Sequence, residues 1–419
     1  MSRYKVPRGT FDILPADSYK WQFVIDAFRE VAREFNYKEI ITPIFEKSDL
    51  FERSVGELSD IVEKEMYKFE DKKGRILALR PEGTAPVVRS FIENGLNLKP
   101  NSSKLYYLGP MFRYDRPQKG RYRQFYQFGI ENIGSNDSYN DAEVIGFANM
   151  FLSKLGLKNF ELQINSIGCK NCTKDYDNAL KEYFAPFKND LCSDCNKRLE
   201  KNPKRVLDCK VKTCKVIAGK APSMLDYLDE DCTTNFNKVQ QYLTAMGIPF
   251  KVNPKIVRGL DYYSQTAFEF IDTNLGAQNT LIGGGRYDTL AEQLGGKNMP
   301  GVGFAGGFER LLLSMGEEKL SLGKQQIPKA YLVTLGDEAR IAGIKLLMEL
   351  RKNGISSEFD PDKTSMNAQM KAANKTGAKF ALILGEDELE SDKVILKNLE
   401  NGEQKDVNIS DIIQTIKDK

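Results

Sequence analysis

The chain has 419 residues, which is too long for one ordinary hydrophobic core, so its length predicts two or three domains. With 61 basic and 58 acidic side chains the formal net charge is only +3, so a polyanion would have to be held by local patches. There is no histidine, which excludes the commonest general base and the commonest protein metal ligand from any chemistry here.

No apolar run follows the N-terminal residues, and no stretch is long enough to span a bilayer. We therefore expect a cytoplasmic protein with no membrane attachment. In that reducing compartment its seven cysteines are expected to be thiols or metal ligands, not disulfides.

The first part of the chain alternates helices with strands. Residues 17–36 carry apolar side chains at three- and four-residue steps, which predicts an amphipathic helix. Residues 37–51 favour a strand in which Pro43 lies at an edge or a boundary. Residues 75–92 predict a strand, a turn at 81–83 and a second helix.

A hairpin is predicted next, with strands at 104–117 and 121–134 joined by a loop around 118–120. Residues 141–157 then predict a helix, and residues 160–168 a strand.

The composition changes near Gly168 and becomes rich in Lys, Cys and helical patterns up to about residue 248. Strand-like chain resumes at 255–271, and GGGRYD and a glycine-rich strand running into a helix follow. KQQIPK resembles a linker, after which strands alternate with helices as in a small α/β domain. The predicted domains are 1–168 and 251–324 (two parts of a core), 169–250 (an insertion) and 328–419.

The hairpin sequence mixes arginines with aromatic residues. On a strand, Arg113 and Asp115 would share one face, as would Arg121, Arg123 and Phe125. A guanidinium fork suits phosphate, and a neighbouring ring can stack on a purine. The residues alone leave two interpretations open: a nucleotide site, or a polar sheet face with a basic turn.

Six segments together resemble the histidyl-tRNA synthetases, a family of class II aminoacyl-tRNA synthetases. The helix at 17–36 with KEIITPIFE resembles motif 1, the hairpin resembles motif 2, and GVGFAGGFERLLL resembles motif 3. LRPEGT, VRGLDYY and GGGRYD resemble segments specific to the family. The resemblance covers nearly the whole chain, and motif 1 implies a homodimer.

The resemblance implies an α+β and α/β multidomain fold. Its parts would be a mostly antiparallel six-stranded catalytic sheet with flanking helices, a helical insertion and a C-terminal α/β anticodon-binding domain. The implied activity is ATP-dependent activation of L-histidine to histidyl-adenylate, followed by transfer to the 3′-terminal ribose of tRNA(His).

For ATP, the resemblance implies that the catalytic residues Arg113 and Arg258 hold the α-phosphate from two sides. Arg121 and Arg310 would hold the outer phosphates, Phe125 would stack on adenine, and Mg²⁺ would neutralise the remaining charge.

For histidine, the resemblance implies that Glu131 and Tyr263 read the imidazole and that Tyr262 lines the pocket. Arg113 and Arg258 would lie near the carboxylate. The α-ammonium would be held by Glu82, Thr84 and Gln127, with Gly83 beside them.

Some positions allow a second interpretation or depart from the family pattern. The glycines of GGGRYD would let backbone approach the substrate, with Arg286 and Tyr287 supporting the pocket, or would only let two strands approach closely. Other departures put affinity in doubt but not the reaction: Asp115 in place of Glu, Tyr126 in place of His, and Ser264–Gln265 in place of Thr-Gly.

Two alternatives belong to other classes. One is the catalytically inactive, synthetase-like regulatory subunit of ATP phosphoribosyltransferase, but such chains typically lack the anticodon domain that residues 328–419 suggest here. The other is a synthetase for a different amino acid, which RGLDYY and Glu131 disfavour.

The insertion contains two cysteine pairs in the pattern C-x2-C-x19-C-x2-C, which is typical of a structural zinc site. The ligands would be Cys169, Cys172, Cys192 and Cys195, although Cys209 and Cys214 could replace one pair and all could instead be unmetallated thiols. The basic residues near the second pair favour contact with tRNA phosphates over a solvated face: Lys197, Arg198, Lys201, Lys204, Arg205, Lys210, Lys212 and Lys215.

Overall fold

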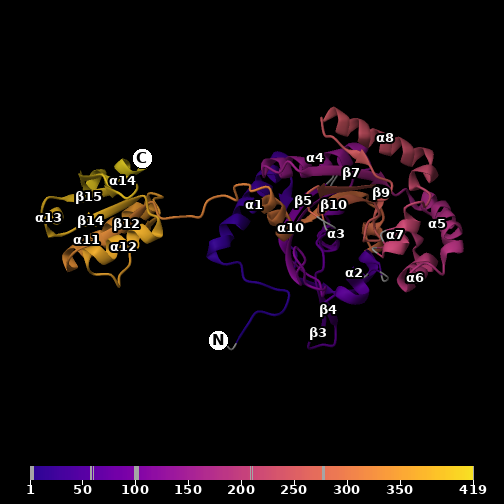
Figure 1. The fold of residues 1–419 in the computed structure, drawn as a ribbon, viewed down its shortest axis with the longest axis horizontal. Coiled ribbons are helices and arrows are strands. Elements are labelled where there is room, and N and C mark those ends of the chain that lie inside the picture. Colours follow the sequence, from indigo (N-terminus) through magenta and orange to yellow (C-terminus); the bar gives the residue numbers. More distant parts are fainter. Residues whose placement is uncertain are drawn as a thin grey trace. The chain divides into compact units, whose positions relative to one another are not determined.

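The computed structural model describes residues 4–56, 59, 61–98, 103–207, 209, 211–275 and 279–418. The chain divides into two compact units, Met1–Gly323 and Lys324–Lys419 (Figure 1). Among the described residues, none of the helices combines the length and the apolar character that a membrane crossing requires.

The first unit is built on one large sheet. In spatial order its strands are β1 (Lys38–Glu39), β5 (Ser103–Phe112), β6 (Gln124–Ile133), β11 (Gly301–Gly307), β10 (Thr280–Tyr287), β9 (Ser264–Asp272), β7 (Phe160–Ser166) and β8 (Lys251–Val252). The six longer strands are antiparallel, which confirms the predicted core. The two-residue strands β1 and β8 extend it by parallel pairing at the edges.

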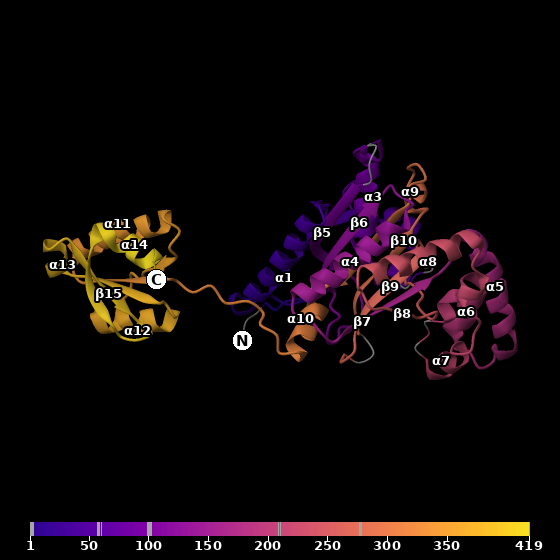
Figure 2. The ribbon, with the colours of Figure 1, turned by 90° about the horizontal axis from the view of Figure 1, so that it is seen from above.

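The two faces of this sheet differ because side chains alternate along each strand. On one face Phe128, Phe304 and Phe268 pack in the main core with α1 (Pro15–Glu34) and α4 (Ser138–Lys154) (Figure 2). On the other face, hydrogen-bonded neighbours across the middle strands are Glu131, Gly303, Gly285 and Ala267. Since most of these residues are small, the second face is left open at its centre.

The remaining elements of this unit surround the sheet. A small sheet has the order β2 (Phe45–Lys47), β4 (Ile76–Leu79), β3 (Lys68–Glu70). The other helices around the two sheets are α2 (Ser48–Val55), a π-helical turn (Ile61–Glu65), α3 (Thr84–Glu93), α9 (Leu290–Gln293) and α10 (Phe308–Glu317). A helical lobe contains α5 (Lys170–Phe184), α6 (Ser193–Lys201), α7 (Lys212–Ala218) and α8 (Glu230–Ala245), of which α8 packs on α4 (Figure 1).

Four predicted strands are shorter than expected. The region 37–51 forms only β1 and β2 before α2 begins, and residues 255–263 precede β9 as a loop. The hairpin strands end at Phe112 and resume at Gln124, with a single bridge between Gln118 and Arg121. Pro117 cannot donate to a ladder and Gly120 has a φ of +75°, so the chain between them turns instead of continuing the sheet.

The second unit is α/β, as predicted. Its sheet has the order β13 (Ser357–Glu358), β12 (Ala330–Thr334), β14 (Phe380–Leu384), β15 (Lys393–Asn398), β16 (Gln404–Asn408). Strand β12 pairs in parallel with both neighbours, and β14, β15 and β16 are antiparallel. The helices are α11 (Asp337–Lys352), α12 (Met366–Thr376), α13 (Glu386–Glu390) and α14 (Ile412–Lys417).

Candidate active site

A cavity of about 450 Å³ lies over the open face of the large sheet, a size suited to a small-molecule ligand. Gly283, Ala305 and Gly307 contribute to its floor. Ten of the predicted site residues line it: Glu82, Thr84, Arg113, Arg121, Phe125, Gln127, Arg258, Tyr262, Tyr263 and Arg310. The segments that resemble synthetase motifs therefore converge on one place, although they are far apart in the sequence.

Three of the arginines that line this cavity come from the hairpin and from α10: Arg113, Arg121 and Arg310. Arg113 donates from Nε to the Pro81 carbonyl at 2.8 Å, and its guanidinium lies 5.4 Å from the centre of the Phe125 ring. Arg310 donates from Nη1 to the Thr280 carbonyl at 2.8 Å. Burial, together with repulsion from Arg121 and Arg113, lowers the pKa of Arg310. A cavity that gathers cations against their mutual repulsion is suited to an anion such as a polyphosphate.

Arg121 lies on the loop between the hairpin strands and pairs with Asp115 at 2.7 Å. The prediction that Arg121 and Arg123 share a strand face is wrong, because neither residue is in a strand. Arg123 instead lies 3.8 Å from the centre of the Tyr114 ring, and it is not among the residues that line the cavity.

Arg258 enters the cavity from the loop before β9. It forms an ion pair with Glu269 and lies 5.4 Å from the centre of the Tyr263 ring, while its buried Nε has no partner among the described residues. Gly283 makes room for this arrangement, since a Cβ there would overlap the Arg258 guanidinium. The backbone of β10 therefore sets the height of this guanidinium above the floor.

Glu131 is fully buried in β6 and lies behind the cavity wall. Its Oε1 accepts from the Thr84 hydroxyl at 2.7 Å and its Oε2 accepts from the Tyr287 hydroxyl at 2.5 Å. Burial raises the pKa of Glu131 to about 8, which favours the protonated carboxyl at neutral pH. Direct contact between Glu131 and a bound side chain stays a prediction.

The turn before α3 is organised by Glu82. Its carboxylate accepts from the backbone N–H groups of Thr84 at 2.7 Å and Ala85 at 2.8 Å, which satisfies the start of the helix. Gly83 does not line the cavity but donates its N–H to Oε1 of Gln127 at 3.0 Å. The buried Tyr107 hydroxyl is 3.5 Å from the same oxygen, a neighbour that its place in the KLYYLG strand could have suggested.

Glu309 is a cavity residue that the sequence analysis missed, although it directly precedes Arg310. Its Oε1 accepts from the Tyr126 N–H at 2.9 Å, its buried Oε2 has no partner among the described residues, and burial raises its pKa to about 7. A buried, unpartnered carboxylate oxygen beside several arginines fits a divalent cation that bridges protein and phosphate. Glu309 and Asp115 could therefore hold Mg²⁺.

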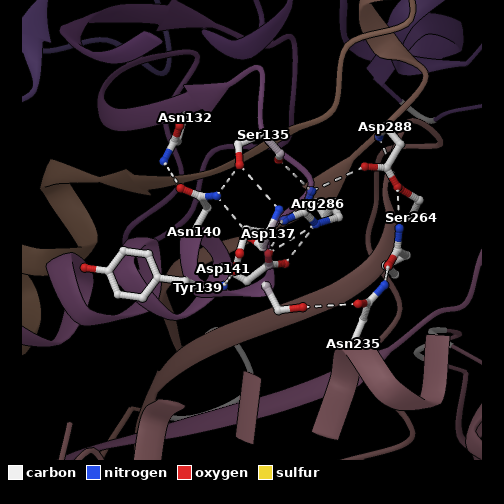
Figure 3. Close-up of polar contacts among 12 residues, drawn as sticks. Asn132, Ser135, Asp137, Tyr139, Asn140, Asp141, Asn235, Ser264, Arg286 and Asp288 are labelled. Atoms are coloured by element: carbon white, nitrogen blue, oxygen red, sulfur yellow. Dashed lines mark hydrogen bonds and ion pairs between the residues drawn. The ribbon is translucent and has the colours of Figure 1, made fainter. Parts of the chain in front are cut away.

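Arg286 does not support the cavity wall as expected. It points to α4, where it pairs with Asp141 and donates to the carbonyls of Ser135 at 3.1 Å and Asp137 at 3.3 Å (Figure 3). Tyr287, in contrast, does support the pocket through Glu131.

Ser264 and Gln265, which depart from the family pattern, join the polar network around Arg286 and Asp288. Both side chains donate to Oδ2 of Asp288 at 2.8 Å, and Gln265 also accepts from Nδ2 of Asn235 in α8 at 3.2 Å (Figure 3). Gln265 has a φ of +47°, a region that glycine adopts more readily, so its hydrogen bonds offset a local backbone cost.

We expect Arg286→Ala to lower the free energy of unfolding by about 3–5 kcal/mol, because it leaves the buried Asp141 carboxylate without a counter-charge. Urea unfolding followed by fluorescence of Trp21, the chain's one tryptophan, would report on this unit. Arg33→Ala, at an exposed position of α1, is the matched control and should change the value by less than about 0.5 kcal/mol. A loss below about 1 kcal/mol for Arg286→Ala would contradict a buried ion pair.

The helical lobe reaches the cavity, which the sequence did not indicate. Arg198 and Arg205 contribute to its lining. Arg205 donates from Nη2 to Oδ1 of Asp261 at 2.9 Å and to the Gly259 carbonyl at 3.2 Å, and Asn202 donates to the same Asp261 oxygen at 3.1 Å. The lobe therefore holds the RGLD segment from outside.

The predicted grouping of four cysteines as one metal site is wrong. Cys192 and Cys195 cluster with Cys209 and Cys214, the replacement pair that the spacing left open. Cys169 and Cys172 cluster separately with Asp229 and Cys232. The intervening helix α5 carries the first pair to a different part of the lobe, which sequence spacing alone could not show.

Comparison with known proteins agrees with this geometry. The family profile of histidyl-tRNA synthetases matches residues 9–171 and 210–311, and that of an anticodon-binding domain matches residues 329–419. The chain belongs to the histidyl-tRNA synthetase family. It is therefore an aminoacyl-tRNA synthetase by descent, and the predicted family and fold are confirmed.

Relatives within the histidyl-tRNA synthetase family align over almost the full length. The histidine–tRNA ligase of Caldanaerobacter subterraneus is 50% identical over 413 residues, 99% of each chain, and that of Bacillus velezensis is 52% identical over 417 residues, 99% of this chain and 98% of that one. A crystal structure of apo S. aureus histidyl-tRNA synthetase is similar with a TM-score of 0.85 and 42% identity, covering 99% of this chain and 100% of that one.

The regulatory alternative receives less support. A Bacillus halodurans structure described as an ATP phosphoribosyltransferase regulatory subunit/histidyl-tRNA synthetase has a TM-score of 0.66 at 21% identity, which shows a shared fold only. The much higher identity to histidine–tRNA ligases favours the synthetase interpretation.

Proposed function

We propose that this protein is an active histidine–tRNA ligase that works in the cytoplasm. It would activate L-histidine with ATP to form histidyl-adenylate and pyrophosphate, then transfer the histidyl group to the 3′-terminal ribose of tRNA(His). The observation that carries this proposal is the convergence of Arg113, Arg258 and Arg310 on one cavity beside the Glu131–Thr84–Tyr287 hydrogen bonds.

The first step joins a carboxylate oxygen of histidine to the α-phosphorus of ATP as the bond to pyrophosphate breaks. Negative charge shifts onto phosphate oxygens, so fixed cations lower the barrier more than a base would. Arg113 and Arg258 hold the α-phosphate and the carboxylate, and Arg121 and Arg310 hold the leaving pyrophosphate. Phe125 stacks on adenine, and Glu309 and Asp115 would hold Mg²⁺, which would supply further charge neutralisation.

Histidine would be selected by its ring nitrogens. Glu131 and Tyr263 offer an acceptor and a hydroxyl to the imidazole, and Tyr262 closes the pocket beside them. Glu82, Thr84 and Gln127 face the α-ammonium, next to the Gly83 backbone. A substrate without matching nitrogens would leave buried polar groups unpaired, which is the basis of strict discrimination.

In the second step a ribose hydroxyl oxygen of tRNA(His) attacks the histidyl carbonyl carbon. The bond from that carbon to the phosphate oxygen breaks, AMP leaves, and the hydroxyl proton is released. The tRNA would be held by the basic residues of the helical lobe, including Lys197 and Lys201, and by the C-terminal unit at the anticodon. Zinc has no part in either chemical step of this proposal.

A homodimer is part of the proposal. Apolar side chains around the small sheet are unusually exposed, with Ile41 at 83%. They include Ile41, Ile44, Phe45, Phe69 and Ile76. Phe45 and Phe69 lie with ring centres 6.2 Å apart, and Ile41, Ile44 and Phe45 belong to the segment that resembles motif 1. Burial between two copies is the expected use of this surface.

The test is amino-acid-dependent exchange of labelled pyrophosphate into ATP, without tRNA, against a panel of amino acids. Exchange with histidine alone is expected, because the adenylate step needs only the cavity described above. The protein should first be shown to be dimeric by light scattering. Folded, dimeric protein that exchanges with no amino acid would support the regulatory alternative, and exchange with another amino acid would overturn the assigned substrate.

A further inference from the structure

Two clusters of potential metal ligands lie in the helical lobe, and together they contain all seven cysteines of the chain. The first cluster consists of Cys192, Cys195, Cys209 and Cys214, and the second consists of Cys169, Cys172, Asp229 and Cys232. Within each cluster the four ligand atoms lie within 4.8 Å of one another. Cysteines that only fill space in a core are not expected to place their sulfur atoms together. Here four thiols form one group, and three thiols and a carboxylate form the other.

The distances between sulfur atoms within each cluster are too long for a disulfide bond and are similar to those between ligands of one metal ion. The Sγ atoms of Cys192 and Cys209 are 3.9 Å apart, and those of Cys169 and Cys172 are 3.6 Å apart. A disulfide requires about 2.05 Å. Four sulfurs at about 2.3 Å from a tetrahedral zinc ion would lie about 3.8 Å from one another, which is close to both observed values.

The surrounding backbone is arranged to stabilise thiolates. Cys169 and Cys192 are the N-cap residues of α5 and α6, and the second cysteine of each pair lies in the first helical turn. The Cys192 N–H donates to Sγ of Cys214 at 3.2 Å, and the Asp229 N–H donates to Sγ of Cys172 at 3.2 Å. Such N–H donors orient metal ligands and spread their negative charge.

We propose that the lobe binds two structural Zn²⁺ ions, one in the four-cysteine cluster and one in the cluster of three cysteines and Asp229. Each set supplies four ligands, so neither ion keeps an open position for catalysis. Binding displaces the thiol protons into solvent, which leaves each site with a net charge of about −2. Helices α6 and α7, which carry two of the first site's ligands, also carry positive charges of the sign that would offset it: Lys197, Lys201, Lys212 and Lys215.

The two ions would stabilise different parts of the lobe. The first closes the segment between Cys192 and Cys214, which carries Asn202 and Arg205 to Asp261. The second joins the start of α5 to the start of α8, two helices that are far apart in the sequence of the lobe. Zinc at the first site therefore acts on the active site only by positioning the RGLD segment.

The experiment measures zinc per chain by mass spectrometry in full-length protein purified without chelator, with release by an organomercurial as a second count. Two zinc ions per chain are expected in the natural sequence. The double variant Cys192→Ser/Cys195→Ser should retain one. Asp229→Asn keeps a residue that can cap α8 but removes the carboxylate. The zinc content of this variant should therefore fall to one ion per chain after dialysis against EDTA, under conditions that leave two zinc ions in the natural protein.

Asp231→Asn is the matched control, because Asp231 lies in the same first turn of α8 but outside the cluster, and it should retain two. Less than one zinc per chain, or seven thiols that all react freely in the folded protein, would overturn the proposal. A site is also overturned if its own variant leaves the zinc content unchanged. Histidine-dependent exchange without bound zinc would leave the proposed function standing, so the two failures are distinguishable.

Discussion

Arg258→Ala is expected to lower kcat/KM for histidine activation by about 10²–10³-fold with the fold intact, because it removes a fixed cation from the charge that develops on the α-phosphate. Its guanidinium contacts Glu269 and Tyr263, and its Nε has no partner among the residues that the structure describes, so this donor would be available to a substrate. Arg258→Lys keeps the charge but loses the planar fork, so we expect only partial recovery. Steady-state pyrophosphate exchange with saturating ATP gives both kcat and the KM for histidine.

A second substitution tests the same guanidinium without removing it. Gly283→Ala would push a methyl group into Arg258 and should lower kcat, whereas Gly316→Ala, at an exposed position of α10 with nothing within 4 Å, should not. Arg33→Ala on α1 is the control for loss of a positive charge. If Arg258→Ala and Arg33→Ala exchange at the same rate, the assigned role of Arg258 is wrong.

Glu131→Gln is expected to reduce histidine-dependent exchange by about 100-fold or more, with little change in the KM for ATP. The carboxyl accepts from Thr84 on one oxygen and from Tyr287 on the other. An amide has only one acceptor oxygen, so it cannot reproduce both bonds and also accept from an imidazole. The measurement is exchange as a function of histidine concentration, compared with exchange as a function of ATP.

The same variant has a pH signature in stability. The pKa of Glu131 is raised from an ordinary value of 4.5 to about 8 in the folded protein, so between those values the unfolded chain is ionised while the folded chain holds the proton. Stability that this proton contributes is present below about pH 4.5 and is lost as the pH rises towards 8.

Glu131→Gln removes this dependence. The difference in free energy of unfolding, variant minus natural protein, should therefore increase by up to about 1.4 kcal/mol per pH unit from pH 5 to 8. Urea unfolding followed by Trp21 fluorescence measures this difference. A difference that stays constant over that range would show that Glu131 is ionised in the folded protein.

Much of the fold followed from local patterns. The helix at 17–36 was predictable because its apolar residues recur at the helical period. The antiparallel core was expected from the family resemblance and not from the strand pattern. The hairpin was found but its strands were overextended, since Pro117 and Gly120 end the ladder before the arginine-rich loop. The family resemblance named ten residues that do line the cavity, but also Gly83 and Glu131, which do not, and it missed Glu309, Arg198 and Arg205.

What could not be predicted depends on contacts between distant segments. The separation of Cys169 from Cys192 arises from helix packing within the lobe, and the contact of Arg205 with Asp261 joins the helical lobe to the loop before β9. Arg286 looked like a pocket residue because it follows three glycines, yet the alternation of β10 turns it to Asp141 on the far face. Sequence neighbours on a strand point in opposite directions, so proximity in a motif is weak evidence for a shared role.

The floor of the cavity has a consequence for protein engineering. Gly283 and Gly303 already present bare backbone to Arg258 and Glu131, so neither position has a side chain that could be shortened to make room. Variants that accept a larger amino acid would therefore have to be sought in the walls, at Tyr262 or Tyr263, because a rotamer can move aside and a paired strand cannot. Substitutions at these two glycines add atoms to the floor, so they can only reduce the space for a ligand.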